Sequence, residues 1–424
     1  MEAKDPADAA VKSESSSGSS CCKPKSGCCK PKSKQTPPVS CTPVSETESA
    51  AKSSCCKPKQ KQDEEVKDSV KEYYGKVLGN SDDLKTNACC TSGAMNPRLK
   101  SALKNVHDEV LAKYYGCGGV EFDIVDGRRI LDLGSGSGRD VYVLAQWVGA
   151  DGFVVGVDMT DEQLEVARKH EEFHREKFGF NKSNVSFLKG YLEQLDQLDL
   201  EPASFDIITS NCVINLCPDK RTVLKQAFSL LKEGGMMEFS DVYAERRIPE
   251  ALRKDPVLWG ECLSGALYWA DFERIAVECG FSKPLIIKDS VITIENSRVE
   301  EKIGHIGFYS VTYRLTKLPA DELETTEEDY GQAVIYKGTI PEHEHEWELA
   351  FNMKFLTGKV TPVSGNTFST LKYSRFASHF DFIGDKSRHY GPFEGVGGIR
   401  IPFKTAKQVG SVETTPVGGA TSCC

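Results

Sequence analysis

The cysteines are the residues whose type and spacing first suggest chemistry in this sequence. The stretch Ser20–Lys34 reads SCCKPKSGCCKPKSK, a third CCKPK begins at Cys55, and the 424-residue chain contains 16 cysteines in all. Adjacent cysteines rarely bridge each other, but a pair can bind one thiophilic ion, and nearby lysines lower the pKa of a thiol. The repeats therefore favour chemistry with a soft element over structural disulfides.

Cysteines outside these repeats stand at positions from which they could converge. Cys212 ends an apolar run, Cys117 precedes another, and Cys262 lies in a long connection that would cover the mouth of a site. Three thiolates from separate loops can hold one small trigonal-pyramidal ion. A zinc site is less well supported because the chain contains no C-x-x-C pair. We expect no structural metal.

Other candidate ligands have plainer explanations. Cys217 and Cys279 are expected to be small buried hydrophobic residues, since free cysteine is among the most buried residue types. The stretch His343–His345 could chelate a metal, but a solvated turn before a strand is the preferred interpretation.

A glycine loop is the most informative motif of the central region. The sequence ILDLGSGSGRD places Gly134, Gly136 and Gly138 between an expected strand and an expected helix, where the backbone can approach a ligand closely. A dinucleotide fingerprint would have its third glycine at Arg139, so a pyrophosphate ligand is disfavoured. Asp158 ends the next apolar run, where its carboxylate can accept the ribose hydroxyl protons of a nucleoside.

Strands and helices that alternate along the chain are expected to position these residues. The apolar runs RRILDLG, FVVGVD, VSFLKG, FDIITSN and GGMMEFSDV are predicted strands, and LIIKDSVITI and IGFYSVTYRL are two more. Predicted helices are NPRLKSALKNVHDEVLAKYYG, DEQLEVARKHEEFHREKFG with Thr160 as its N-cap, RTVLKQAFSLLKEGG and DFERIAVECGF. This alternation predicts an α/β fold with a mostly parallel, doubly wound sheet.

Composition divides the chain into four segments. Residues 1–65 are rich in Ser, Lys, Pro and Gly and are predicted to be disordered, as are residues 405–424. Residues 66–318 form the expected α/β domain, with an insertion at 243–270. The acidic stretch PADELETTEEDYG is the expected linker after this domain. Beyond it, large apolar residues alternate with smaller or polar ones in WELAFNMKF, as in a half-buried strand, which suggests a small α+β domain over 325–404.

Charge and hydropathy exclude several classes of partner. The formal net charge of −9 disfavours nucleic acid as the main partner, because phosphate binding requires a basic surface. The N-terminus lacks the pattern of a signal peptide, and no apolar run approaches the ~18–20 residues that span a bilayer. We therefore expect a cytoplasmic protein, whose cysteines are thiols because that compartment is reducing.

The motif D-x-G-x-G-x-G from Asp132 onward, with Asp158 at the end of a strand, resembles the nucleoside-binding half of class I S-adenosylmethionine-dependent methyltransferases. Five segments in order are similar to those of the arsenite methyltransferase family. They are VKEYYGKVLGNSDDLKTNAC, NVHDEVLAKYYGCG, ILDLGSGSGRDVYVL, SNCVINLCPDK and VLWGECLSGALYW. The resemblance implies a Rossmann-like methyltransferase fold, with S-adenosylmethionine as methyl donor and arsenite or methylarsenite as acceptor.

The same resemblance implies a role for individual residues. Cys117, Cys212 and Cys262 match the cysteines that bind trivalent arsenic, and Cys89 matches the one that pairs with Cys117 as a disulfide during turnover. Cys90 could replace Cys89 in that role. Thioredoxin or glutathione would then reopen the bridge. The donor site would comprise Tyr115, Asp132, Gly134, Gly136, Gly138, Asp158, Met159, Leu192, Glu193 and Asn211.

Two questions about function stay open at the level of sequence. One hypothesis is that the CCKPK repeats and the Cys423–Cys424 pair collect arsenite and pass it to the core site; the alternative is that they are dispensable or respond to other metals. The competing functions for the whole chain are a metalloid-sequestering thiol protein and a methyltransferase with another small acceptor. An intact glycine loop with Asp158 disfavours the sequestering protein.

Overall fold

A computed structural model describes residues 59–72, 96–116, 119–255, 258–259, 262–294 and 296–393. The CCKPK repeats, Cys89, Cys90, Cys117 and the Cys423–Cys424 pair lie outside these residues. Helix α1 (Lys59–Glu72) begins within the tail that was predicted to be disordered up to residue 65. Its sequence contains no glycine or proline and is rich in Lys, Gln and Glu, which are good helix formers.

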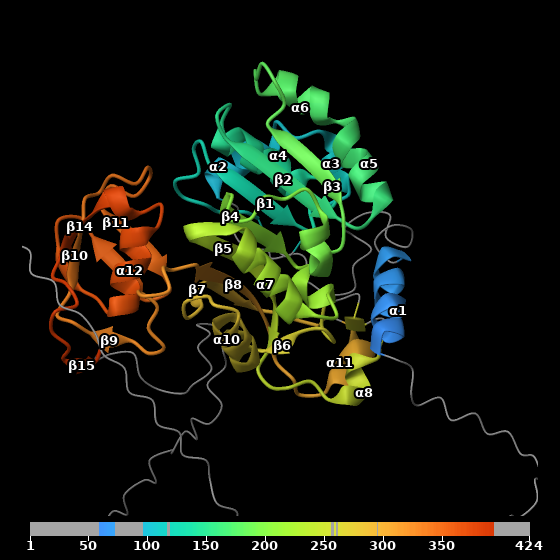
Figure 1. The fold of residues 1–424 in the computed structure, drawn as a ribbon. Helices are drawn as coiled ribbons and strands as arrows, with labels where there is room; N and C mark the ends of the chain where they lie inside the picture. The colour runs from blue at the N-terminus through green and yellow to red at the C-terminus, as the bar shows by residue number, and fades with distance from the viewer. Residues whose placement is uncertain are drawn as a thin grey trace, which may run out of the picture. The chain divides into compact units, whose positions relative to one another are not determined.

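The main feature of the fold is a central sheet flanked by helices (Figure 1). Seven strands follow the order β3-β2-β1-β4-β5-β8-β7, and β6 pairs with β5 off this path. Strands β1 to β5 pair in parallel, while β8 runs antiparallel to both of its neighbours. The strands are β1 (Arg129–Leu133), β2 (Phe153–Asp158), β3 (Val185–Lys189), β4 (Phe205–Asn211), β5 (Leu231–Ala244), β6 (Leu267–Tyr268), β7 (Leu285–Val291) and β8 (Phe308–Thr316).

Helices cover both faces of this sheet, so the prediction of a doubly wound α/β fold is confirmed. Apolar side chains of α2, α4 and α5 pack on one face, and those of η4, α7 and α10 pack on the other. The helices of this region are α2 (Pro97–Leu103), α3 (Asp108–Ala112), α4 (Arg139–Val148), α5 (Asp161–Lys169), α6 (Glu171–Lys177), η4 (Leu192–Gln197), η5 (Ile214–Leu216), α7 (Lys220–Leu230), α8 (Glu250–Arg253), α10 (Trp269–Glu278) and α11 (Ser297–Ile303).

Two predicted helices are divided in the structure. The stretch 97–116 forms α2 and α3 with a turn between them, because the Nδ1 of His107 accepts a hydrogen bond from the Glu109 N–H and starts a new helix. The second long helix breaks at His170, whose backbone leaves the helical region between α5 and α6. Both stretches are helical as predicted, but the spacing of apolar residues alone does not reveal a residue that ends one helix and starts the next.

The C-terminal region forms a smaller group of strands around one helix. Strands β10 (Ala333–Tyr336), β13 (Val360–Pro362) and β14 (Phe380–Ile383) make one sheet, with α12 (Gly365–Tyr373), η6 (Ala377–His379) and the pair β9 (Glu328–Asp329) and β15 (Gly391–Pro392). The predicted single strand WELAFNMKF is wrong. It is a hairpin of β11 (Glu346–Ala350) and β12 (Met353–Leu356) that turns at Asn352, which has a φ of 66°.

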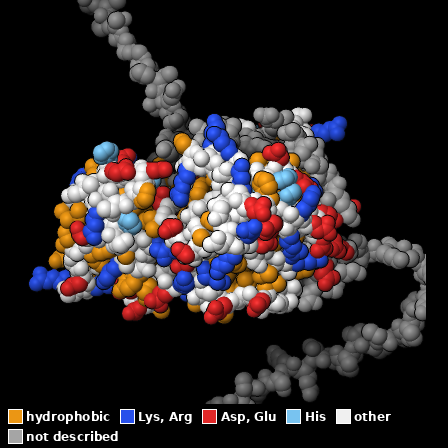
Figure 2. Space-filling model, turned by 90° about the horizontal axis from the view of Figure 1, so that it is seen from above, with side chains coloured by type: hydrophobic (Ala, Val, Ile, Leu, Met, Phe, Trp, Pro, Cys, Tyr) orange, Lys and Arg blue, Asp and Glu red, His pale blue; other side chains and the backbone are white. Residues whose placement is uncertain are grey.

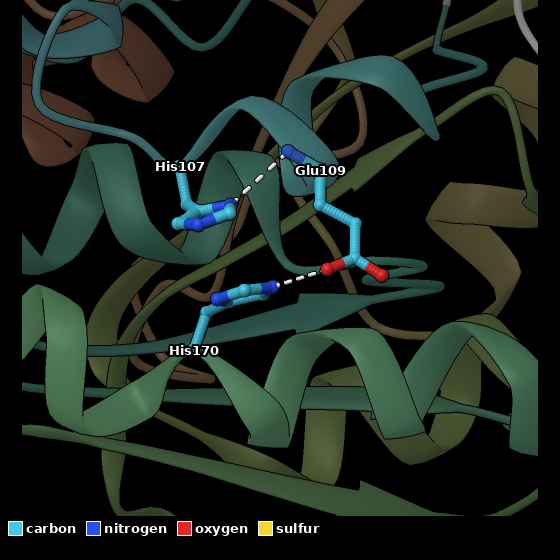
Figure 3. A group of neighbouring side chains, drawn as sticks. All are labelled: His107, Glu109 and His170. Atoms are coloured by element: carbon cyan, nitrogen blue, oxygen red, sulfur yellow. Dashed lines mark hydrogen bonds and ion pairs between the residues drawn. The ribbon is translucent and has the colours of Figure 1, made fainter.

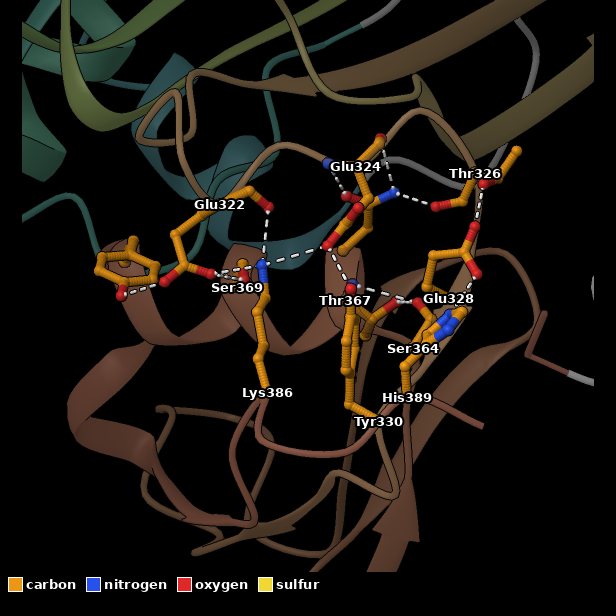
Figure 4. A network of polar contacts seen from close by, with 12 residues as sticks. Glu322, Glu324, Thr326, Glu328, Tyr330, Ser364, Thr367, Ser369, Lys386 and His389 are labelled. Carbon is orange, nitrogen blue, oxygen red and sulfur yellow. Dashed lines mark hydrogen bonds and ion pairs between the residues drawn. The ribbon is translucent and has the colours of Figure 1, made fainter. Parts of the chain in front are cut away.

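The acidic linker before this region is tied to it by polar contacts (Figure 4). The Glu322 carboxylate accepts a hydrogen bond from the Tyr373 hydroxyl at 2.8 Å and lies 2.8 Å from the Lys386 ammonium. Glu324 accepts from the Tyr330 hydroxyl at 2.8 Å. The linker is therefore part of the packed structure of the C-terminal strands and of α12.

A buried ion cluster joins the C-terminal region to the central sheet. Glu238 on β5 is 2% exposed, and its carboxylate accepts hydrogen bonds from Arg314 on β8 and from Arg375 after α12. The Arg375 Nε also donates to the Asp123 carbonyl at 3.0 Å. Burial raises the pKa of Glu238, but the two guanidinium groups outweigh burial and hold that pKa below its usual value.

On the surface, charges of both signs are mixed. Figure 2 shows Lys and Arg interspersed with Asp and Glu over one face of the described residues. Many of these side chains pair, as Arg247 does with Asp271 at 2.6 Å, and such exposed pairs contribute little to stability individually. None of the helices that the structure describes is both long enough and apolar enough to cross a membrane.

Candidate active site at the carboxyl ends of the strands

A pocket opens where β1, β2, β3 and β4 end, the usual ligand position in a doubly wound sheet. Its volume is about 1020 Å³, part of which is open to solvent. The predicted donor-site residues that line it are Tyr115, Asp132, Gly134, Gly136, Asp158, Met159, Leu192, Glu193 and Asn211. The structure thus brings together residues that are separated by up to ninety-six positions in the sequence.

Gly138 differs from the other two glycines of the loop. It does not line the pocket; it is the N-cap residue of α4, with a φ of 88°, and a Cβ there would lie 2.9 Å from the Phe187 ring. Gly138 therefore packs α4 against β3, and its predicted contact with the cofactor stays a prediction. A Cβ on Gly134 would lie 2.4 Å from Val213, so this glycine allows the loop to approach β4.

Asp158 fixes the shape of the glycine loop from the end of β2. Its Oδ2 accepts the Gly136 N–H at 2.9 Å, and its Oδ1 accepts the Thr160 N–H at 2.8 Å. Thr160 is the N-cap residue of α5 as predicted, but its side chain makes no capping bond to that helix. Burial raises the pKa of Asp158, although the backbone N–H groups partly oppose this effect.

Replacing Asp158 tests this arrangement. We expect Asp158→Ala to weaken donor binding about 10- to 100-fold, because hydrogen bonds to a charged group contribute about 1.5–3 kcal/mol each. Isothermal titration with S-adenosylhomocysteine measures the effect. Asp151→Ala, in the exposed turn before β2, is the matched control and should bind as the unmodified protein does. Equal affinities for the two variants would contradict a donor-binding role for Asp158.

A polar network that the sequence analysis missed adjoins the glycine loop. The Arg139 guanidinium lies 2.7 Å from the Asp140 carboxylate and 3.1 Å from the centroid of the Tyr114 ring. The Asn211 amide donates to the Tyr114 hydroxyl at 2.5 Å and to Asp140 at 3.1 Å. Burial raises the pKa of the neighbouring Asp132. The sequence signal was the charged Arg-Asp pair at the start of a buried helix.

Helix α1 closes another side of the pocket. Lys67 and Val70 line it, and the Lys67 ammonium lies 3.2 Å from the Glu193 carboxylate. Lys71 donates to the Tyr191 hydroxyl at 2.5 Å. The other oxygen of Glu193 is buried and has no hydrogen-bond partner among the described residues. A buried carboxylate oxygen without a partner is suited to accept a hydrogen bond from a hydroxyl group of a bound ligand.

Two of the predicted arsenic-binding cysteines are in contact, and one of them, Cys212, lies at the pocket wall. Cys212 lines the pocket and is 4% exposed, and Cys262 is 0% exposed. The Cys262 thiol donates to the Cys212 carbonyl oxygen with a separation of 3.5 Å. Both residues have left-handed backbones, with φ values of 56° and 60°. Such conformations are costly for residues other than glycine and cluster at functional sites.

The chain just before Cys117 also reaches this place. A Cβ built on Gly116 would lie 2.8 Å from the Asn211 side chain, so Gly116 is adjacent to the residue that precedes Cys212. Cys212 is disulfide-bonded. The Cys212 sulfur therefore has to be reduced before it can act as a thiolate ligand.

Neighbouring cysteines and histidines have structural roles. Cys217 and Cys279 are buried free thiols in the main apolar core, and burial raises the pKa of each. Cys217 also touches the pocket, but its raised pKa makes it a poor thiolate. The His343 stretch forms a turn before β11, and the His343 ring lies 3.5 Å from Asp123.

His107, Glu109 and His170 have potential metal-ligand atoms within 4.8 Å of one another (Figure 3). These atoms already have partners. His107 caps α3, and the Glu109 carboxylate lies 2.7 Å from both His170 and Lys169. The two imidazole rings are stacked at 3.6 Å, so their in-plane lone pairs do not converge on one point. We interpret the group as a contact that holds α3 against the junction of α5 and α6.

The chain is similar to known methyltransferases over most of its length. Residues 124–280 match a methyltransferase domain, and residues 330–424 match the arsenite methyltransferase C-terminal domain. The arsenite methyltransferase of Aquipseudomonas alcaligenes is 56% identical over 357 residues, 84% of this chain and 99% of that protein. The Homo sapiens arsenite methyltransferase is 44% identical over 369 residues, 86% of this chain and 97% of that protein.

A solved structure extends the match to three dimensions. The crystal structure of an arsenic(III) S-adenosylmethionine methyltransferase from Chlamydomonas reinhardtii is 48% identical, with a TM-score of 0.69. The match covers 71% of this chain and 100% of that one. These similarities, over most of the chain, show that the protein belongs to the arsenite methyltransferase family.

Proposed function

We propose that this protein transfers methyl groups from S-adenosylmethionine to trivalent arsenic held by cysteine sulfurs. The observation that carries the proposal is the contact between Cys262 and Cys212 at the wall of the glycine-loop pocket. A sulfur site beside a nucleoside pocket suits the transfer of a methyl group to a thiophilic acceptor. The product is mono-, di- or trimethylated arsenic.

The pocket fits the methyl donor on two structural grounds. The glycine loop leaves open space at Gly136, where the nearest atom to an added Cβ would be the Gln163 Oε1 at 3.7 Å, and the buried Glu193 oxygen has no partner among the described residues. When bound, the donor supplies an electrophilic methyl group on a sulfonium. Asp158 and Glu193 would accept ribose hydroxyls, while Tyr115 and Asn211 would line the side from which the methyl group leaves.

Arsenic is the substrate of the sulfur site. Bound to three thiolates, trivalent arsenic keeps a lone pair, and this lone pair is the nucleophile. Cys212 and Cys262 would orient it toward the donor pocket, with Cys117 as the third sulfur. The buried position of both described cysteines excludes water, so the protein contributes orientation and desolvation, and no general base is required.

Turnover also needs two electrons for each methyl group. Methyl transfer oxidises trivalent arsenic to the pentavalent state, and two thiolates that close into a disulfide return the two electrons. Cys89, or its neighbour Cys90, would pair with Cys117 in this step. Thioredoxin or glutathione would then reduce the disulfide by thiol exchange. Because this step needs a reductant, we propose a reducing compartment, the cytoplasm, for the enzyme.

Incubation with arsenite, S-adenosylmethionine and glutathione tests the proposal directly. We expect methylated arsenicals to form, identified by chromatographic speciation with elemental detection. Stoichiometric arsenic binding without a methylated product would instead support a sequestering protein. Methylation of a thiol or another metabolite, with arsenite left unchanged, would support a different acceptor.

A further inference from the structure

The two loops that carry Cys212 and Cys262 touch at a second point that the sequence did not indicate. Gly265 lies against the backbone of Asn215, and a Cβ built on it would be 2.1 Å from the Asn215 carbonyl oxygen and 3.0 Å from its carbonyl carbon. Contacts under 3.0 Å are essentially never made by a real Cβ. Because the neighbouring atoms are backbone, they cannot rotate away as a side chain would.

Asn215 is held in place from three directions. Its N–H donates to the buried Asp241 carboxylate at 2.9 Å, and its side-chain amide donates to the Val242 carbonyl at 2.5 Å. Its carbonyl oxygen accepts a hydrogen bond from Lys220 at 3.1 Å. An added methyl group on Gly265 therefore cannot displace Asn215 without breaking bonds to β5 or to Lys220.

The loop that carries Cys262 is equally confined. Leu263, Ser264 and Ala266 are buried, and the Ser264 hydroxyl donates to the Leu252 carbonyl at 2.6 Å. Gly265 follows Cys262 by three residues, just as Asn215 follows Cys212 by three. The backbone contact at Gly265 and the contact between the two cysteines are therefore two closely spaced links between the same pair of loops.

From this geometry we infer that Gly265 is a positioning residue, which sets the separation of the two arsenic-binding sulfurs by letting its loop rest on the Asn215 backbone. The inference depends on the proposed function of the sulfur site. A Cβ would need about 1 Å or more of additional separation to reach ordinary contact distance. Displacements of about 1 Å at a reacting centre can lower rates by about 100-fold.

The variant Gly265→Ala tests this role in the full-length protein. We expect its KM for arsenite to rise about tenfold or more, while its affinity for S-adenosylhomocysteine stays within about twofold of the native value. Gly265 does not line the donor pocket, so unchanged donor binding shows that the fold is intact. If Gly265 affected only stability, the substitution would not raise the KM for arsenite while leaving the affinity for S-adenosylhomocysteine unchanged.

Gly307→Ala is the matched control. Gly307 also has an ordinary φ, and a Cβ there meets only the flexible carboxylate end of Glu245, at 2.9 Å. We expect it to behave as the native protein in both assays. If Gly265→Ala has a native KM for arsenite, the inference is overturned. If the native protein itself produces no methylated arsenic, the proposed function fails instead.

A second pair of variants keeps the test decisive if Gly265→Ala does not fold. Lys220→Met removes the hydrogen bonds to the Asn215 and Cys217 carbonyls, whereas Lys220→Arg keeps a donor at this place. We expect the Met variant to raise the KM for arsenite severalfold without changing donor affinity, and the Arg variant to restore it in part. Native kinetics for Lys220→Met would show that fixing Asn215 does not set the sulfur geometry.

Discussion

Cys262→Ser is expected to lower the rate of arsenite methylation at least about 100-fold while S-adenosylhomocysteine binds normally. Loss of residues that merely support metal ligands typically costs about 10- to 100-fold, so loss of a direct sulfur ligand should cost more. Serine is a hard oxygen donor that trivalent arsenic binds poorly compared with a thiolate. Cys262 is absent from the lining of the donor pocket, which is why donor affinity should not change.

The matched control for this substitution is Cys279→Ser. Cys279 is also a buried cysteine, but it lies at the end of α10 in the apolar core, away from the pocket. Arsenic methylation by this variant should remain close to native. The measurement is the rate of product formation at saturating donor. Native activity in Cys262→Ser would favour an acceptor other than thiol-bound arsenic.

The largest expected effect on stability comes from Glu238→Gln. This change leaves Arg314 and Arg375 buried side by side without their counter-ion. Removing one member of a buried ion cluster typically destabilises a protein by about 3–5 kcal/mol, because the remaining charges lose their compensation. Urea-induced unfolding followed by circular dichroism measures the change in the free energy of unfolding.

The loss of stability caused by Glu238→Gln should also depend on pH. The folded-state pKa of Glu238 lies below its unfolded value. The Glu238 carboxylate therefore stabilises the folded state at pH values above its unfolded pKa, and this stabilisation is lost as the pH falls through the folded pKa. We expect the difference between Glu238→Gln and the native protein to be largest near neutral pH and to shrink in acid. Glu301→Gln, at an exposed position on α11, should unfold like the native protein. Equal stabilities for the two variants would contradict the assigned role.

Much of the fold could be predicted because the strands are short and strongly apolar. Each of the runs from RRILDLG to IGFYSVTYRL is a strand, and the acid at the end of β2 lies beside the glycine loop. The two elements that were predicted wrongly, a divided helix and a hairpin, share a physical cause. The break at His107 and the turn at Asn352 depend on one side-chain cap and one left-handed residue, and neither changes the hydrophobic period.

The site was predictable only in part for a different reason. Motifs indicated the glycine loop and Cys212, because their positions at strand ends imply a location in the fold. Lys67 and Tyr114 line the pocket, and Arg139 packs on the Tyr114 ring. These contacts arise from tertiary packing, which a single sequence does not reveal. The contact of Gly265 with the Asn215 backbone was beyond reach for the same reason.

The left-handed backbones of Cys212 and Cys262 imply a trade-off between foldability and reactivity. Each such conformation costs on the order of 1–3 kcal/mol for a residue with a side chain, and glycine would adopt it with little penalty. Only cysteine, however, supplies a thiolate at these two points. The native state is therefore less stable than the same architecture with glycine there would be, and an arsenic ion that bridges both loops would recover part of that deficit.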